Sequence, residues 1–238
     1  MRHRRLEVCE STNDEARAAF DRGEPAPLLI SSAAQTSGRG RAGRSWTQLP
    51  GNFAGTFLFD APRALAREPG VVSLLSALAI REVLVSHGVE PAAIALKWPN
   101  DVLLREAKVA GILGEMLTAG RRSAILVGVG VNLAAAPERT RFRASAVFPQ
   151  RPPDPRRFGE ALGDRLSSWI NQVAERGVEP VFSAWRNHAW RRGRALTVTI
   201  GSQSLTGIFS DIDGHGRLIL RLPDGRERTV SAGDTAAG

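Results

Sequence analysis

Three nearly continuous apolar runs lie close together in the middle of the chain, at residues 94–98, 109–116 and 124–131. Each run has the length of a strand, and strands that lack polar alternation are typical of sheets with covered faces. Segments with the apolar period of a helix flank the runs, at residues 71–86, 158–175 and 180–190. The pattern predicts an α/β (α+β) fold in which helices cover a sheet.

The first sixty residues predict one helix, at 13–22, and three more strands, at 5–8, 28–33 and 53–59. Thr12 and Glu15 have the spacing of a capping box at the start of this helix, and Gly23 would end it. A polar loop rich in glycine and arginine, residues 35–46, separates the second of these strands from the third.

The sequence changes character after Arg194. Four short β-rich segments alternate there with the turn sequences GlySer, AspGlyHisGly and ProAspGlyArg. Four strands in about 45 residues are too few for a core of their own unless they curl into a small barrel or pack on a neighbour. We therefore expect two domains, one of residues 1–192 and a small β-domain of residues 193–238.

Cysteine and histidine are scarce, with one cysteine, Cys9, and four scattered histidines among 238 residues. A single thiol excludes an internal disulfide, and no Cys/His spacing for a structural zinc can be assembled. The longest apolar stretch, residues 71–80, is too short to span a membrane, and the basic N-terminal residues are not followed by the apolar run of a secretory signal. These features predict a cytoplasmic protein with no membrane partner.

The formal net charge of +8 comes from 30 arginines and only two lysines. A basic chain suits nucleic acid as a partner, but these arginines are spread from Arg2 to Arg228 without a dense block. Because arginine fills nearly every basic position, Lys97 and Lys108 mark places where a compact, deprotonatable or differently shaped cation is needed.

The densest chemistry lies in GlnThrSerGlyArgGlyArgAlaGlyArgSerTrp, residues 35–46. Its glycines allow the backbone to approach an anion, and its arginines supply forked donors that match phosphate or carboxylate. Residues 38–45 have the spacing of a P-loop, but Arg44 replaces the lysine and the following residues cannot continue as a helix. An RGG-like RNA-binding segment would need repeats. A flexible surface loop without a ligand remains the alternative.

A second group of motifs consists of LysTrpProAsnAsp at residues 97–101 and LysValAlaGlyIleLeu at residues 108–113. We expect the first to end a strand in a turn that presents Asn100 and Asp101 at the mouth of the sheet. Gly111 would let a ligand lie against bare backbone. A hairpin with a solvated turn would give the same pattern but would not explain the two lysines.

With SerThrAsn at residues 11–13 and GlyValGlyValAsnLeu at residues 128–133, these motifs stand in an order and spacing that resemble the bacterial biotin protein ligases. The resemblance covers Ser11 to Leu133, and the β-domain lies where that family has an SH3-like barrel. It implies a mixed-sheet catalytic domain like that of class II aminoacyl-tRNA synthetases. It also implies that biotin and ATP form biotinyl-5'-AMP and pyrophosphate, after which a lysine of the biotin carboxyl carrier protein of acetyl-CoA carboxylase, or of a related carboxylase, takes the biotinyl group.

The resemblance assigns roles to individual residues. Those implied to bind biotin are Ser11, Thr12, Asn13, Gln35, Gly38, Arg39, Gly40, Arg41, Lys108, Gly111, Ile112 and Gly128. Those implied to bind ATP or the adenylate are Arg41, Arg44, Trp46, Asn100, Asp101, Lys108 and Asn132. Lys108, Arg41 and Arg39 would be catalytic, because attack of a carboxylate on the α-phosphate requires positioned cations. Mg²⁺ would arrive with ATP, near Asn100 and Asp101, and no intrinsic metal site is expected.

Some of these assignments have alternatives. Ser11 and Thr12 could serve only to cap the helix. A lipoate protein ligase of the same superfamily would adenylate a different acid, although the two basic motifs favour biotin. An Arg-rich nucleic-acid-binding protein would instead form salt-dependent complexes and release no pyrophosphate. Only ten residues precede Ser11, so we expect no winged helix and no operator DNA, and the protein could be a monomer or a homodimer.

Overall fold

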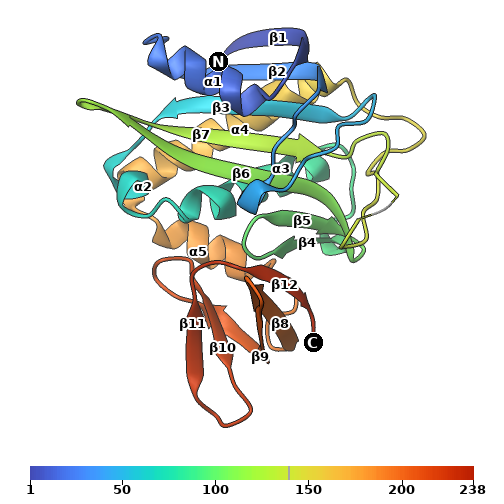
Figure 1. The fold of residues 1–238 in the computed structure, drawn as a ribbon, viewed down its shortest axis with the longest axis vertical. Coiled ribbons are helices and arrows are strands. Elements are labelled where there is room, and N and C mark those ends of the chain that lie inside the picture. Colours follow the sequence, from blue (N-terminus) through green and yellow to red (C-terminus); the bar gives the residue numbers. More distant parts are fainter. Residues whose placement is uncertain (139) are drawn as a thin grey trace.

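The computed structural model describes residues 1–138 and 140–238. Seven strands form a mixed sheet in the order β1-β2-β3-β7-β6-β5-β4 (Figure 1). Its strands are β1 (Arg2–Cys9), β2 (Leu28–Gln35), β3 (Phe53–Asp60), β4 (Ile94–Lys97), β5 (Asp101–Leu104), β6 (Ala107–Ala119) and β7 (Arg122–Val131). β1 and β2 are parallel, and all other neighbours are antiparallel. The predicted mixed α/β class is confirmed.

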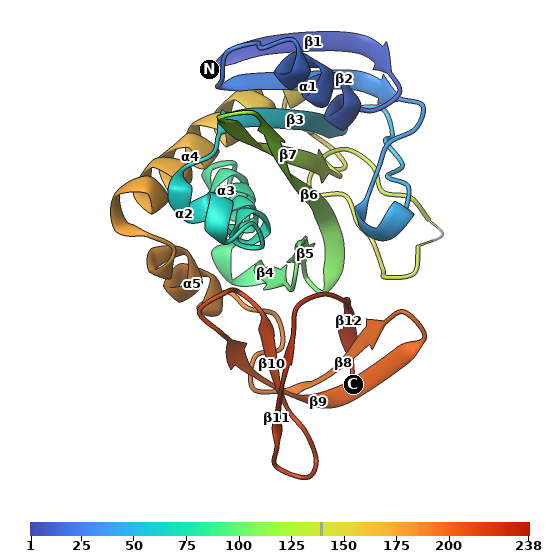
Figure 2. The same ribbon diagram turned by 60° about the vertical axis from the view of Figure 1, so that its left-hand side comes forward.

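Helices cover both faces of this sheet. α1 (Thr12–Asp21) packs on one face against β2, β3 and β7. The other face carries α2 (Arg63–Arg67), α3 (Val71–Ser86), α4 (Pro155–Arg176) and α5 (Glu179–Arg186) (Figure 2). Along β7, Ile125 and Val127 enter the larger core, whereas Ala124 and Leu126 enter the cluster under α1. Because both faces are buried, the strands read as continuous apolar runs.

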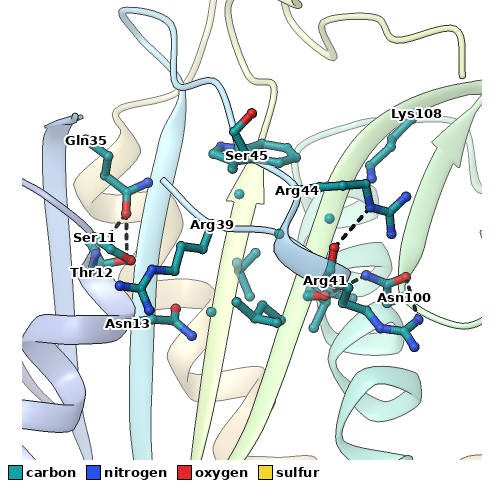
Figure 3. Close-up of a pocket in the computed structure, with 18 residues that line it drawn as sticks. Ser11, Thr12, Asn13, Gln35, Arg39, Arg41, Arg44, Ser45, Asn100 and Lys108 are labelled. Carbon is teal, nitrogen blue, oxygen red and sulfur yellow. Dashed lines mark hydrogen bonds between the residues drawn. The ribbon is translucent and has the colours of Figure 1, made fainter. Parts of the chain in front are cut away.

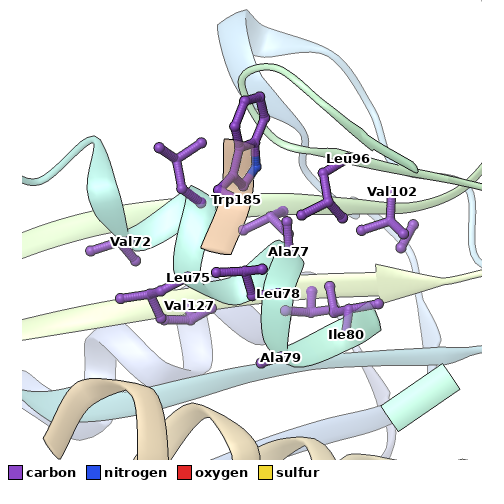
Figure 4. Close-up of a cluster of buried hydrophobic side chains, with 14 of the residues drawn as sticks. Val72, Leu75, Ala77, Leu78, Ala79, Ile80, Leu96, Val102, Val127 and Trp185 are labelled. Atoms are coloured by element: carbon purple, nitrogen blue, oxygen red, sulfur yellow. The ribbon is translucent and has the colours of Figure 1, made fainter. Parts of the chain in front are cut away.

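α3 lies at the centre of the larger core. Eleven of its sixteen residues are buried, so the helix is apolar on nearly all sides. Figure 4 shows it between Val127 of the sheet, Leu96 of β4 and Trp185 of α5. No helix in the described part of the chain is both long enough and apolar enough to cross a membrane.

The C-terminal residues form a separate antiparallel sheet in the order β11-β10-β9-β8-β12. Its strands are β8 (Ala195–Ile200), β9 (Gln203–Ile212), β10 (Leu218–Arg221), β11 (Glu227–Val230) and β12 (Asp234–Ala237). The prediction of four strands is therefore wrong by one, because β12 is short and Thr235 is the one residue of AspThrAlaAla that favours a strand. It is held by pairing with β8.

Two hydrogen bonds attach this second sheet to the first at Trp98. The indole Nε1 of Trp98 donates to the carbonyl oxygen of Gly216 at 3.0 Å. The Thr235 hydroxyl, on β12, donates to the carbonyl oxygen of Trp98 at 2.8 Å. β12 therefore begins beside the turn between β4 and β5, which carries Asn100 and Asp101.

Candidate active site

The first turn of α1 places Ser11, Thr12 and Asn13, all buried, at the edge of a cavity. Gln35, at the end of β2, caps this helix because its Oε1 accepts a hydrogen bond from the backbone N–H of Thr12 at 2.8 Å. Ser11 is the N-cap residue and makes no side-chain cap. The predicted capping box of Thr12 and Glu15 is therefore wrong. Thr12 lies within the first turn, and its hydroxyl faces Gln35 Oε1 at 3.1 Å instead.

Asn13 links three strands beneath this turn. Its Nδ2 donates to Glu115 Oε1 on β6 at 2.8 Å, and its Oδ1 accepts from the fully buried Thr56 hydroxyl on β3 at 2.6 Å. On β7, a Cβ added at Gly128 would stand 2.2 Å from Asn13 Oδ1, so only glycine lets the amide approach this closely. The predicted ligand contact of Asn13 thus depends on a hydrogen-bonded network that fixes its amide.

The three arginines of the loop between β2 and β3 contact three different parts of the chain, and Figure 3 shows Arg41 beside Asn100. Arg39 Nη2 pairs with Asp14 Oδ2 of α1 at 2.6 Å, and Arg44 Nη1 pairs with Asp234 of β12 at 3.0 Å. Arg41 donates to the neutral Oδ1 of Asn100 at 3.3 Å. Burial lowers the pKa of Arg41 below its usual value, and the nearby charge of Arg44 lowers it further.

The same loop closes on itself through Gly38 and Trp46. The Trp46 backbone N–H donates to the Gly38 carbonyl oxygen at 2.8 Å, and a Cβ at Gly38 would stand 2.5 Å from the Trp46 carbonyl oxygen. The Trp46 ring lies over two glycines of the sheet. A Cβ at Gly130 would be 2.1 Å from its Cε2, and one at Gly111 would be 3.1 Å from its Cζ3.

Both lysines of the chain converge on Asp101. Lys108 Nζ lies 2.6 Å from Asp101 Oδ1, and Lys97 Nζ lies 3.4 Å from Asp101 Oδ2. The Lys97 side chain is buried, with Nζ 4.7 Å from the centre of the Phe142 ring. Burial lowers the pKa of Lys97 from its usual value, although the Asp101 carboxylate opposes the shift. Lys97 is thus a buried cation at the end of β4.

Two adjoining cavities result. The first, of about 110 Å³, lies between α1, the arginine loop and strands β6 and β7. The second, of about 260 Å³, lies between the loop, the lysine pair, β12 and a segment that contributes Pro137, Thr140, Arg141, Phe142 and Ala144. They share four lining residues: Arg44, Ser45, Trp46 and Lys108. Within residues 1–138 and 140–238, no cluster of three or more His, Cys, Asp or Glu side chains is placed to hold a metal.

Residues 6–132 match the Biotin/lipoate A/B protein ligase family, and residues 193–235 match the Biotin protein ligase C terminal domain. The chain belongs to the biotin/lipoate A/B protein ligase family. It is 38% identical to the biotin--[acetyl-CoA-carboxylase] ligase of Paracoccus denitrificans over 92% of this chain and 93% of that one. It is 36% identical to the ligase of the same name from Mycobacterium tuberculosis over 94% of this chain and 84% of that one.

A solved structure of this family shares the fold. The biotin protein ligase from Aquifex aeolicus, in complex with biotin and ATP, matches with a TM-score of 0.83 and 22% identity over 99% of this chain and 97% of that one. At this identity the comparison supports the fold alone.

In this member of the ligase family, every residue predicted to bind biotin except Gly38 lines the first cavity. Gly38 lies outside both cavities and serves the closure of the loop. Of the residues predicted to bind the nucleotide, Arg41 and Asn100 line the first cavity, and the others line the second: Arg44, Trp46, Asp101, Lys108 and Asn132.

Several residues of the site were not predicted. Thr56 and Glu115 are polar residues within the apolar strands PheAlaGlyThrPheLeuPhe and GlyIleLeuGlyGluMetLeu, and such an interruption was a usable signal. Asp234 and Thr235 gave no local signal, because only the pairing of β12 with β8 brings them to the second cavity.

Proposed function

We propose that this protein is a biotin protein ligase that uses ATP to convert biotin to biotinyl-5'-AMP and then transfers the biotinyl group to a lysine of a carrier protein. The position of Lys108 carries the proposal. Its ammonium borders both cavities, so a carboxylate in the first and a phosphate in the second would meet beside it. The similarity to two biotin--[acetyl-CoA-carboxylase] ligases over most of the chain supports the same conclusion.

The first cavity suits an acid with a polar head. Hydrogen-bonding side chains gather at one end, where Thr12, Asn13 and Gln35 lie, and Arg39 and Arg41 border the same cavity. The ureido ring of biotin would lie at the α1 end with its carboxylate near Lys108. Ile112 and Val129 supply apolar contacts for the atoms between them.

The second cavity suits a nucleotide. Phe142, Ala144 and Pro137 provide apolar walls, and Arg44, Lys97 and Lys108 provide cations. Asn132, also in its lining, is buried, and its Oδ1 has no hydrogen-bond partner among the described residues. The exocyclic amine of adenine is a donor that would satisfy this acceptor.

In the first step, a carboxylate oxygen of biotin attacks the α-phosphorus of ATP, and pyrophosphate leaves with the electrons of the broken P–O bond. The carboxylate and the α-phosphate are both anions, so hydrogen-bond donors that contact both of them lower the activation barrier. Lys108 lies between them, and Arg41 adds a second cation. Trp46, which lines both cavities, would shield the mixed anhydride from water.

Mg²⁺ fits this site as an ion brought by ATP. Asp101 is the carboxylate that borders the second cavity beside Lys108, but its two oxygens already lie against Lys108 and Lys97. It would have to give up one of these lysines to bind a metal. Asn100 is also occupied, since its Nδ2 donates to the Ile112 carbonyl oxygen at 2.7 Å. When bound, Mg²⁺ would neutralise phosphate charge.

In the second step, a lysine amine of a biotin carboxyl carrier protein attacks the carbonyl carbon of the anhydride, forms an amide and releases AMP. We propose that residues 1–192 carry both steps. Residues 193–238, an SH3-like unit, complete the second cavity through Thr199, Asp234 and Thr235. The single thiol, Cys9, suits a reducing compartment such as the cytoplasm.

Biotin-dependent exchange of labelled pyrophosphate into ATP tests the first step without the carrier. We expect exchange with biotin and at least 100-fold less with lipoate, a difference of about 2.7 kcal/mol, because the polar groups of the first cavity would lack partners. Preferential exchange with lipoate would replace biotin with lipoate in the proposal. No exchange with either acid, together with a tight, salt-dependent nucleic-acid complex, would favour the nucleic-acid-binding alternative.

A further inference from the structure

We infer that Glu115, held by Arg17, is a positioning residue that fixes the hydrogen-bonding direction of the first cavity and so selects a ligand whose head group carries N–H donors. The inference rests on the proposed function and adds the origin of its specificity. Glu115 does not line the cavity. It acts through Asn13, which does.

The Glu115 carboxylate decides which way the Asn13 amide faces. Its Oε1 lies 2.8 Å from Asn13 Nδ2, and its Oε2 is paired with the guanidinium of Arg17 on the next turn of α1. An ionised carboxylate only accepts hydrogen bonds, so the amide nitrogen of Asn13 must face it. Arg17 compensates the charge and holds the carboxylate in place.

This orientation then propagates to the neighbouring hydroxyls. With its nitrogen on Glu115, Asn13 turns Oδ1 towards Thr56, whose hydroxyl donates at 2.6 Å. The Thr56 hydroxyl has a single proton, which it donates in this bond. Its oxygen, 2.9 Å from Thr12 Oγ1, can then only accept from Thr12. The Thr12 proton therefore goes to Thr56 or to Gln35 Oε1, and in neither case towards the cavity.

The α1 end of the cavity consequently offers acceptors. Thr12 Oγ1 and Asn13 Oδ1 each keep lone pairs that the protein network does not use. A cyclic urea brings two N–H donors to these acceptors, whereas the dithiolane ring of lipoate brings none. When a ligand covers these acceptors without supplying donors, their remaining lone pairs lose the hydrogen bonds that water would give, so the network discriminates against such a ligand.

Glu115→Gln tests the inference, because glutamine keeps the shape but can donate as well as accept, which lets the Asn13 amide turn over. We expect the KM for biotin in pyrophosphate exchange to rise about tenfold. The KM for ATP and the maximal rate should stay within about twofold, and the preference for biotin over lipoate should fall. Glu7→Gln is the matched control, since it removes the same charge from an exposed position on β1.

A purely structural role for Glu115 would lower the melting temperature and the maximal rate while the KM for biotin stayed unchanged. That result would overturn the inference alone, provided that the parent protein exchanges pyrophosphate. A parent without biotin-dependent exchange would overturn the proposed function and the inference with it. If Glu115→Gln does not fold, Arg17→Gln decides. It leaves the carboxylate but removes its partner, and we expect a rise of about threefold in the KM for biotin, against no change if the inference is wrong.

Discussion

Lys108→Arg is the substitution that tests the proposed chemistry most directly. It keeps the positive charge at the boundary of the two cavities and changes only the shape of the cation. A lysine ammonium can turn its donors towards two anions that approach from different sides. An arginine guanidinium is wider and holds its donors in one plane. We therefore expect folding to be preserved and adenylation to be strongly impaired.

The surroundings of Lys108 set the magnitude. Its Nζ lies 2.6 Å from Asp101 Oδ1. A Cβ at Gly111 would be 3.3 Å from Lys108 Nζ, so the ammonium lies against bare backbone. The guanidinium could keep the pair with Asp101 but would have little room to reach both ligands. Loss of one positioned donor to developing charge costs about 10²–10³-fold in rate. Because the charge remains, we expect the lower end, about 10²-fold, or about 2.7 kcal/mol.

The assay is biotin-dependent pyrophosphate exchange at saturating biotin and ATP, with a melting curve to confirm folding. Lys108→Met, which removes the charge as well, should lose more activity than Lys108→Arg. Arg221→Lys, the reverse exchange at an exposed position of β10, is the control and should retain parental activity. Exchange by Lys108→Arg within a few-fold of the parent would show that position 108 needs only a positive charge, and would refute the reasoning from shape.

Three further outcomes are expected. Gly128→Ala should raise the KM for biotin, because its Cβ would meet Asn13 Oδ1 at 2.2 Å. Gly130→Ala should mainly raise the KM for ATP, because its Cβ would meet Trp46 at 2.1 Å. If each variant changed the KM for biotin and the KM for ATP equally, this assignment would be wrong. Thr235→Val should lower the free energy of unfolding by about 1 kcal/mol in urea titrations, since it removes the hydrogen bond to Trp98. Burial holds the pKa of Lys97 below its usual 10.5, so the unfolded chain binds this proton more tightly. The free energy of unfolding of the parent, relative to that of Lys97→Met, should therefore rise as the pH increases through the folded-state pKa towards 10.5. A difference between the two proteins that does not change with pH would argue against a lowered pKa of Lys97.

The sheet and the residues of the first cavity could be predicted because their signals are local. Continuous apolar runs reflect strands that send alternate residues into two cores, as Leu126 and Val127 do on β7. Motifs such as SerThrAsn and LysTrpProAsnAsp combine residue types that serve a shared chemistry, so their joint presence identifies the cavity that they line.

The remaining features depend on contacts between distant residues. Gln35, and not the expected capping box, caps α1 from 23 residues away. Thr235 reaches Trp98 across 137 residues, through a strand whose own sequence has weak β-propensity. Glu115 stands out in its strand as a charged residue among apolar ones, but its partner Asn13 lies 102 residues away in the sequence. Each of these contacts is decided by the packing of the sheet and not by the residues nearby in the sequence.

Most cations of the two cavities are paired with a carboxylate that lies far away in the sequence or on another element. Arg39, Arg44 and Lys108 are each paired with a carboxylate from a different element, respectively Asp14 of α1, Asp234 of β12 and Asp101 of β5. An anionic ligand must therefore compete with these carboxylates or share the cations with them. Arg41 differs, because the one hydrogen-bond partner of its guanidinium among the described residues is the neutral amide of Asn100, and it is half-buried. A partly desolvated cation without a carboxylate gains most from an incoming anion, so the negative charge of the ligand should interact most strongly with Arg41, while the paired cations orient it.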